Sequence, residues 1–238
     1  MSLVPLLFAY PCSKFKQVKF SEVVDRSMMI TEALYGDYLS HLISGDKRDC
    51  SKIVQSLIDQ EISVKDLYFN LFQKSMYQIG RLWENNEVSV SVEHVATSIT
   101  ESLLNLAYPL IFSEEHTGNK AIVACVPKEY HQIGAKMVAD FIELNGWDSY
   151  FLGSNTPAEE LLRMIDEKKP DLLALSISLF FSIRYLDHMI RLVQNAFPQL
   201  DIIVGGQGMR HGAHKTLDQY SNVQYIESIS KLEKLILS

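Results

Sequence analysis

The sequence predicts a protein of two parts, a four-helix bundle followed by a domain with a five-stranded parallel sheet, which is an α + α/β fold. Apolar residues recur at helical spacing up to about residue 117, and no strand-like run stands out there. Beyond the Thr117-Gly118-Asn119 break, short apolar runs alternate with amphipathic stretches. We therefore predict an N-terminal tail over residues 1–17, a helical domain over 18–116 and an α/β domain over 117–238.

Composition restricts the class of protein. The chain has 238 residues, of which 47% are hydrophobic and 21% charged, so it can bury a core without disulfides or structural zinc. The net charge of −7 argues against direct nucleic-acid binding, which needs clustered Lys and Arg. Cys12, Cys50 and Cys125 are scattered, and the apolar start of the chain has no basic segment before it. We therefore expect a soluble, cytoplasmic protein that does not enter a membrane.

Helical spacing of apolar residues defines four helices in the first part. Gly45 ends the first of them, and Asn85-Asn86-Glu87 is a plausible turn between the last two. Helices of this length with short connections pack as an up-down bundle. The predicted ranges are Phe20–Ser44, Lys47–Gln60, Val64–Trp83 and Ser91–Phe112.

Strands and helices alternate in the second part, which predicts a doubly wound, Rossmann-like (flavodoxin-like) domain. Pro157 suits a helix start, and Pro170 suits the entry to a strand. The predicted strands are Ala121–Val126, Ser149–Leu152, Leu172–Ser178, Ile202–Val204 and Val223–Ile226. The predicted helices are His131–Asn145, Pro157–Glu167, Ser182–Phe197, Met209–Tyr220 and Ile229–Leu237.

The loop after the first strand carries a candidate metal ligand. Ligands of doubly wound sheets bind at the carboxyl ends of the strands, and His131 stands at this end. Glu129 is placed to accept a hydrogen bond from its imidazole, which would fix the tautomer. Gly134 removes a side chain where the next helix starts, so a ligand can approach the backbone. Taken alone, a histidine in a loop is more often a hydrogen-bonded polar residue than a ligand.

Two further features stand at the ends of the third and fourth strands. Ser176 and Ser178 occupy alternate positions, so they share one face and can meet a polar ligand or bond to nearby backbone. Gly205 and Gly206 leave either a slot beside the sheet or a simple turn.

These three features together resemble the cobalamin-binding domains of the methionine synthase and methylmalonyl-CoA mutase type. The shared pattern is Glu129-x-His131-x-x-Gly134, then Ser176-x-Ser178, then Gly205-Gly206, in the same order and at matching separations. The resemblance implies that His131 ligates cobalt with Glu129 as its partner, in the base-off/His-on mode. It also implies that Ser176 lines a pocket for the nucleotide tail of the cofactor and that the two glycines make room for it.

Ser182 is a further candidate in the α/β half. By the same resemblance it would extend the relay between histidine and carboxylate, and it would also serve as a helix cap.

The helical half carries a pattern of its own. Trp83 ends one predicted helix, and Glu93 and His94 begin the next, so a short connection can bring the three together. An indole, a carboxylate and an imidazole suit a purine nucleoside. The alternative is a core tryptophan with a solvated helix start.

Trp-x9-Glu-His ahead of a cobalamin domain resembles the light-sensing region of CarH/LitR-type B12 photoreceptors. The resemblance implies that the bundle caps adenosylcobalamin and that these residues surround its adenosyl group. Two departures matter. Little sequence precedes the bundle, so the MerR-like DNA-binding domain of that family is expected to be missing. Glu84 replaces the histidine that takes the upper cobalt position after light in the best-known members, which puts that ligation in doubt.

Gln132 and Ala135 also differ from the Asp and Lys that methyl-carrier corrinoid proteins usually have around the same motif. We therefore favour a cobalamin-binding sensor of light, with adenosylcobalamin ahead of methylcobalamin or hydroxocobalamin and with no catalytic residues of its own. Its output would pass to a partner protein, such as a transcription regulator, or through self-association. A corrinoid methyl carrier of a methyltransferase system is the main alternative, and cobalamin storage is a third. A mutase is disfavoured because no segment is long enough for a barrel.

Overall fold

The fold is taken from a computed structural model, which describes residues 30–112, 115–210 and 213–237. The predicted tail over residues 1–17 lies outside this part of the chain. The helical half has the predicted four helices within the described ranges, and the third of them includes a π-helical segment. Their bounds are α1 (Glu32–Ser44), α2 (Lys47–Asp59), α3 (Val64–Asp66) with the π segment Leu67–Gln73 and α4 (Lys74–Glu84), and α5 (Val90–Ala107), which ends in a 3-10 turn (Tyr108–Leu110).

Side-chain caps explain where the helices of the bundle begin. Asp46, Ser63 and Ser89 each accept a hydrogen bond from a backbone amide in the first turn that follows them. Thr31 does the same for α1, and its backbone is extended. The first helix therefore starts at Glu32, and the prediction of a start at Phe20 was wrong for the residues that can be checked, Ile30 and Thr31.

The second half is a sheet of parallel strands in the order β2-β1-β3-β4-β5. This order is the flavodoxin-like one, and it confirms the predicted fold class. The strands are β1 (Lys120–Cys125), β2 (Asp148–Phe151), β3 (Leu172–Ser176), β4 (Asp201–Gly205) and β5 (Val223–Tyr225). The connecting helices are α6 (Ile133–Leu144), α7 (Ala158–Lys168), α8 (Ile183–Ala196) and α9 (Ile229–Ile236).

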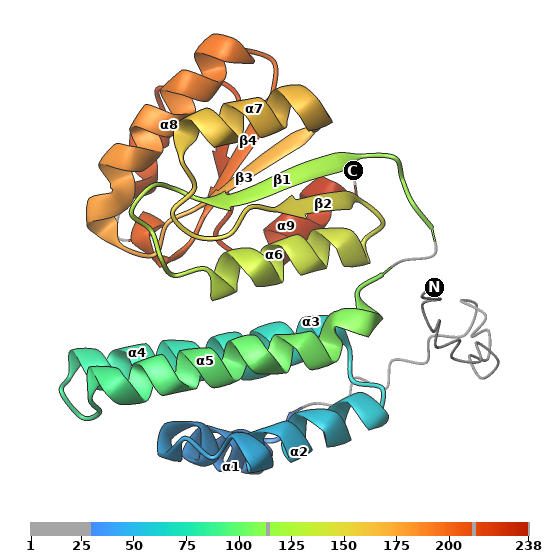
Figure 1. The fold of residues 1–238 in the computed structure, drawn as a ribbon, viewed down its shortest axis with the longest axis vertical. Coiled ribbons are helices and arrows are strands. Elements are labelled where there is room, and N and C mark those ends of the chain that lie inside the picture. The colour runs from blue at the N-terminus through green and yellow to red at the C-terminus, as the bar shows by residue number, and fades with distance from the viewer. Residues whose placement is uncertain (1–29, 113–114, 211–212, 238) are drawn as a thin grey trace, which may run out of the picture.

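Alternation along the strands divides the core into two layers. Ile122, Leu173 and Ile202 pack on one face with residues of α7 and α8, whereas Val123 and Ala174 pack on the other with α6 and α9. Figure 1 shows α7 and α8 on one side of the sheet and α6 and α9 on the other, facing the bundle. None of the helices in the described ranges is long and apolar enough to cross a bilayer.

The segment after β4 differs from the prediction. A helix was expected over Met209–Tyr220, but the described residues there form two short 3-10 turns, Gln207–Met209 and Ala213–Leu217. Gly205, Gly206 and Gly208 stand directly before the expected helix and Gly212 lies inside it, and a glycine in a helix costs roughly 0.5–1 kcal/mol relative to alanine. The predicted strand over Leu172–Ser178 also ends early, at Ser176, because the amides of Ser178 and Leu179 bond to a side chain instead of a neighbouring strand.

The bundle rests on α6. Tyr68 of the π segment donates a buried hydrogen bond of 3.0 Å from its hydroxyl to the Asp140 carboxylate of α6. Phe69 meets Phe141 edge to face, with 5.9 Å between ring centroids. Met137 of α6 belongs to the core of the bundle. One helix of the α/β domain therefore serves both cores and fixes the bundle over one end of the sheet.

Tyr68→Phe tests this contact. The substitution removes a buried hydrogen bond between the two halves but keeps the ring, so we expect a loss of about 1–2 kcal/mol in the free energy of unfolding. Asp140 keeps its bonds to Lys136, which limits the cost. Urea denaturation followed by circular dichroism measures it. Tyr35→Phe is the control because its hydroxyl makes only an exposed bond to a backbone oxygen, and an equal loss in both variants contradicts the assignment.

Candidate functional site

The site lies at the carboxyl ends of the neighbouring strands β1 and β3. From β1 the chain continues to β2 on one side of the pair, and from β3 it continues to β4 on the other, and doubly wound domains bind ligands at such a position. After β1 the chain turns tightly, with a hydrogen bond of 3.1 Å from the Glu129 amide to the Val126 carbonyl. Lys128 has a φ of 67° in this turn and donates its amide hydrogen to Asn155 Oδ1 at 2.9 Å. The turn directs the side chain of Glu129 inward, where it is fully buried.

The carboxylate of Glu129 is bonded on both oxygens. Oε1 accepts from the amide and the Nδ1 of His131, at 3.1 and 2.6 Å. Oε2 accepts from the amides of Ser178 and Leu179 in the β3 loop, at 2.8 and 3.1 Å. Burial alone raises the pKa of a carboxyl, but these hydrogen bonds outweigh it and lower the pKa of Glu129 to about 2. The group is therefore an anion that ties two loops together.

The imidazole of His131 is held in one tautomer by this anion. An ionised carboxylate only accepts hydrogen bonds, so Nδ1 of His131 carries a hydrogen, and in the neutral imidazole Nε2 keeps its lone pair. The bond to Glu129 raises the pKa of His131 against the opposing effect of burial. An oriented imidazole with a basic, free Nε2 is the arrangement found at protein metal ligands.

The ends of β3 and β4 provide the next part of the site. Ser176 is the last residue of β3 and pairs with Gly205, the last residue of β4. Gly206 follows with a φ of 102°, and a Cβ there would collide with the carbonyl oxygen of Ile177. The close approach of two backbones therefore requires glycine at position 206, whereas a Cβ at Gly205 would make only an ordinary contact, 3.8 Å from the carbonyl oxygen of Ile226.

A cavity of about 460 Å³ lies between the two halves of the molecule. Its lining includes most of the residues predicted from the sequence, from the α/β half and from the bundle alike. These are Trp83, Glu93, His94, His131, Gly134, Ser176, Ser178, Gly205 and Gly206. Tertiary structure thus brings motifs far apart in the chain around one space.

The bundle side of the cavity repeats the pairing of an imidazole with a carboxylate. His94 Nδ1 lies 2.7 Å from Glu93 Oε2, and the hydroxyl of Thr97 donates to Glu93 Oε1 at 2.9 Å. Trp83 is 46% exposed at the end of α4, so it does not serve as a core residue, which was the alternative interpretation. Its exposed indole faces a space that has room for a ligand.

Two predicted residues stand behind the cavity instead of lining it. Glu129 is fully buried and does not line the cavity, whereas His131, which it orients, does. Ser182 is fully buried in a 3-10 turn (Phe180–Ser182), and its hydroxyl has no hydrogen-bond partner among the described residues. It makes no side-chain cap on α8, so the structure does not bear out the capping role considered as an alternative for it.

The sequence pattern did not indicate every residue at the cavity. Arg210 follows the glycine-rich loop, and its guanidinium lies 5.1 Å from the ring centroid of Tyr77 on α4. Gln132 and Glu101 also line the cavity and share a hydrogen bond of 3.0 Å. Each pair joins the two halves of the molecule, and its members are far apart in sequence. No local signal relates them, except that Gln132 follows the candidate ligand directly.

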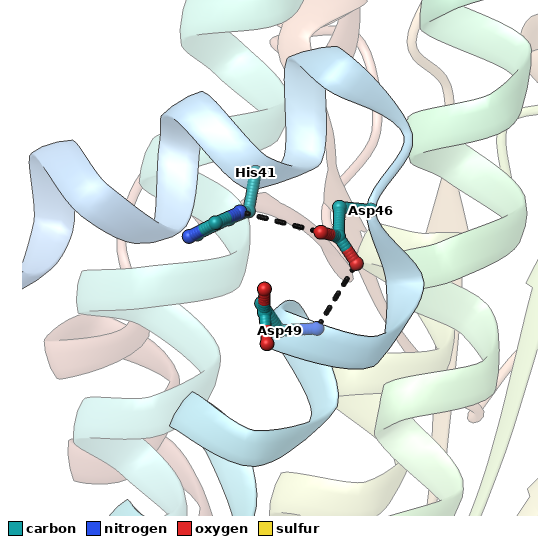
Figure 2. A group of neighbouring side chains, drawn as sticks. All are labelled: His41, Asp46 and Asp49. Atoms are coloured by element: carbon teal, nitrogen blue, oxygen red, sulfur yellow. Dashed lines mark hydrogen bonds and ion pairs between the residues drawn. The ribbon is translucent and has the colours of Figure 1, made fainter.

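Another group of metal-ligating side chains lies at the corner between α1 and α2 (Figure 2). Ligand atoms of His41, Asp46 and Asp49 fall within 4.8 Å of one another. Each of them already has a structural role, because Asp46 caps α2, Asp49 pairs with Lys52, and His41 approaches Asp37 at 3.5 Å. These contacts account for the cluster as a helix corner.

The two halves together define a class of fold, a flavodoxin-like α/β domain with a helical cap. The computed structure is similar to the monomethylamine corrinoid protein of Methanosarcina barkeri, with a TM-score of 0.75 over 86% of this chain and 97% of that one. The sequence identity is 13%, so this likeness concerns the fold.

Family models identify the chain more closely. Residues 119–232 match the B12 binding domain, and residues 34–108 match a second model that is also described as a B12 binding domain. The chain is therefore a member of the B12-binding domain proteins, and its cofactor is of the cobalamin type.

Two curated relatives come from Myxococcus xanthus. The chain is 27% identical to the HTH-type transcriptional repressor CarA over 61% of its own length and 49% of the repressor's. It is 27% identical to the HTH-type transcriptional repressor CarH over 56% of its own length and 44% of that protein's. The chain thus matches about half of each relative's length, which leaves their other activities outside the comparison.

The residues of the site fit a cobalamin on structural grounds. His131 lines the cavity, and the lone pair on its Nε2 is a suitable ligand for a cobalt ion. At Gly134 a Cβ would meet nothing within 4 Å, although this position lines the cavity, so space is kept there for something other than protein.

Gly134→Ala tests that space. The folded protein has room for the methyl group, and alanine is the better helix former, so we expect stability to stay equal or rise by roughly 0.5–1 kcal/mol. Affinity for hydroxocobalamin should fall by about tenfold or more, about 1.4 kcal/mol, because the methyl group enters the ligand's space. Titration followed by absorbance measures it. Gly36→Ala on α1, also without neighbours within 4 Å, is the control, and unchanged affinity in Gly134→Ala contradicts this role.

Proposed function

We propose that this protein is a cobalamin-dependent sensor that holds the cofactor base-off/His-on, with His131 as the lower ligand of cobalt and adenosylcobalamin as the preferred form. One observation carries the proposal: a single cavity is lined by His131 and the glycine pair on one side and by Trp83, Glu93 and His94 on the other. A cofactor seated on the α/β domain would therefore meet an aromatic and hydrogen-bonding surface of the bundle.

The proposed division of labour follows from the chemistry of each group. Glu129 keeps Nε2 of His131 free and aimed at the cavity. Ser176 and the glycine pair would accommodate the nucleotide tail, which is long and polar. Trp83 suits stacking on an adenine ring, while Glu93 and His94 suit hydrogen bonds to its ribose or amino group. Bound adenosylcobalamin supplies a cobalt–carbon bond that light can break.

Output would follow from a changed contact between the bundle and the α/β domain. If the bundle binds the upper group, loss of that group removes binding free energy that favours the original position of the bundle. The equilibrium between positions of the bundle would then shift. Either another protein or a second copy of the chain would then recognise the new arrangement. The matches to CarA and CarH support this sensor role.

A corrinoid methyl carrier is the second candidate. The similarity of fold to the monomethylamine corrinoid protein supports it. In this role the protein would supply ligation and shielding while the cofactor supplies the chemistry. The presence of Trp83, Glu93 and His94 on the bundle side favours a larger upper group than methyl, and this favours the sensor role.

The central test is the absorption spectrum of the full chain reconstituted with adenosylcobalamin in the dark and then exposed to green light. We expect the alkyl-cobalt bands to bleach and the oligomeric size, measured by analytical ultracentrifugation, to change. His131→Ala should lose the His-on spectrum, whereas His116→Ala, which removes an exposed imidazole 3.2 Å from Asp148, should keep it. A spectral change without any change in size or partner binding rules out the sensor role.

Trp83→Ala separates the two candidate functions. If the indole stacks on an adenosyl group, affinity for adenosylcobalamin should fall by about 1–3 kcal/mol while affinity for methylcobalamin changes little. Isothermal titration with both cofactors in the dark measures the difference. Phe112→Ala is a control because this ring is also about half exposed but does not line the cavity. Equal losses for both cofactors would favour the methyl carrier.

A further inference from the structure

Contacts between the bundle and the α/β domain are of two kinds. One group is buried: the hydrogen bond from Tyr68 to Asp140 and the edge-to-face pair of Phe69 and Phe141. These contacts belong to the π-helical segment, and π-helical turns often mark functional positions in helices. The other group is polar and lines the cavity. The bundle is thus held firmly along α6 and more weakly at the edge where a ligand would enter.

Gln132, the residue directly after the candidate ligand His131, makes one of these polar contacts. Its side-chain Nε2 donates to Glu101 Oε1 on α5 at 3.0 Å. Its Oε1 accepts from the amide of Ser154, in the loop after β2, at 3.2 Å. One amide group therefore uses its donor and its acceptor at the same time, toward the bundle and toward the sheet. A carboxylate at this position would repel Glu101, and an aliphatic side chain would make neither bond.

The loop that carries His131 is consequently held from both sides. Glu129 ties it to the β3 loop through two backbone amides. Gln132, the residue directly after His131, ties it to α5. A shift of His131 toward or away from a metal ion would move the backbone of Gln132, and the side-chain amide of Gln132 would carry this shift to Glu101.

From this geometry we propose that Gln132 is a positioning residue that couples ligation at His131 to the position of α5. This inference rests on the proposed function, because it assumes that His131 ligates the cobalt of cobalamin. Ligation of cobalt by His131 would then affect the position of the bundle through Gln132 and Glu101. This effect would not depend on Trp83, Glu93 and His94, which line the bundle side of the cavity. Cofactor binding would stabilise the position of α5, and by thermodynamic linkage a stable position of α5 would strengthen cofactor binding.

The test compares amide hydrogen exchange over 97–107 in the full chain, free and loaded with hydroxocobalamin. In the natural protein we expect loading to slow exchange there by about tenfold, within the usual range of coupling between sites. Gln132→Leu should abolish this slowing while the His-on absorption spectrum remains. A merely structural role would instead speed exchange equally in both states and leave their ratio unchanged, which overturns the proposal.

A charge swap provides the second arm. Gln132→Glu places two carboxylates against each other and should also abolish the coupling. Adding Glu101→Gln restores a donor facing an acceptor, so the double variant should recover most of the ratio. Failure of this rescue counts against the proposal. Gln55→Leu is the matched control, since it removes another amide–carboxylate bond, 2.8 Å to Asp59, on an exposed face of α2.

The outcomes also separate this inference from the proposed function. If the natural protein does not bind hydroxocobalamin with a His-on spectrum, the proposed function fails. If it does so and Gln132→Leu keeps the full slowing over 97–107, only the coupling role of Gln132 fails.

Discussion

A buried carboxylate that is satisfied by four hydrogen-bond donors holds the site of this protein together. Glu129 has no exposed surface, and an ionised group in that position would be costly without partners. Two of its donors come from His131 and two from the loop after β3. The same bonds that stabilise the charge also end β3, join the loop after β1 to the loop after β3, and orient the imidazole. The fold and the site therefore share one electrostatic requirement.

The helical half depends on that arrangement less directly, through α6. This helix starts two residues after His131 and contributes residues to the sheet's core and to the bundle's core. Because α6 is shared, the bundle is placed over the carboxyl ends of the strands and leaves a cavity there instead of a continuous core. The buried contacts of Tyr68 and Phe69 fix one side of this interface, and polar pairs such as Tyr77 with Arg210 hold the other. In the proposed sensor, this division would let the bundle move without separating from the α/β domain.

The two candidate functions differ in what the bundle must do. A carrier needs a cover that admits a small group and a reaction partner, whereas a sensor needs a cover that binds the upper group itself. Trp83, Glu93 and His94 form a surface with stacking and hydrogen-bonding capacity, and Thr97 supports it from the next turn of α5. Cobalamin-binding domains of one fold serve both purposes, so the side chains of the cap, more than the fold, bear on the choice.

The sequence by itself determined the fold class, indicated a cobalamin-type cofactor through its resemblance to a known family, and named nine of the residues that line the cavity. These follow from local signals: periodicity for the helices and strands, and motifs such as Glu129-x-His131-x-x-Gly134 at the ends of strands. Only the tertiary structure decided what relates distant segments, including the partners of Glu129 in the β3 loop, the bond between Gln132 and Glu101, and the contact of Arg210 with Tyr77. It also replaced the expected helix after Met209 with short turns and showed Ser182 buried, with no hydrogen-bond partner for its hydroxyl among the described residues. Such pairings depend on which surfaces meet after folding, and neither spacing nor propensity along the chain contains that information.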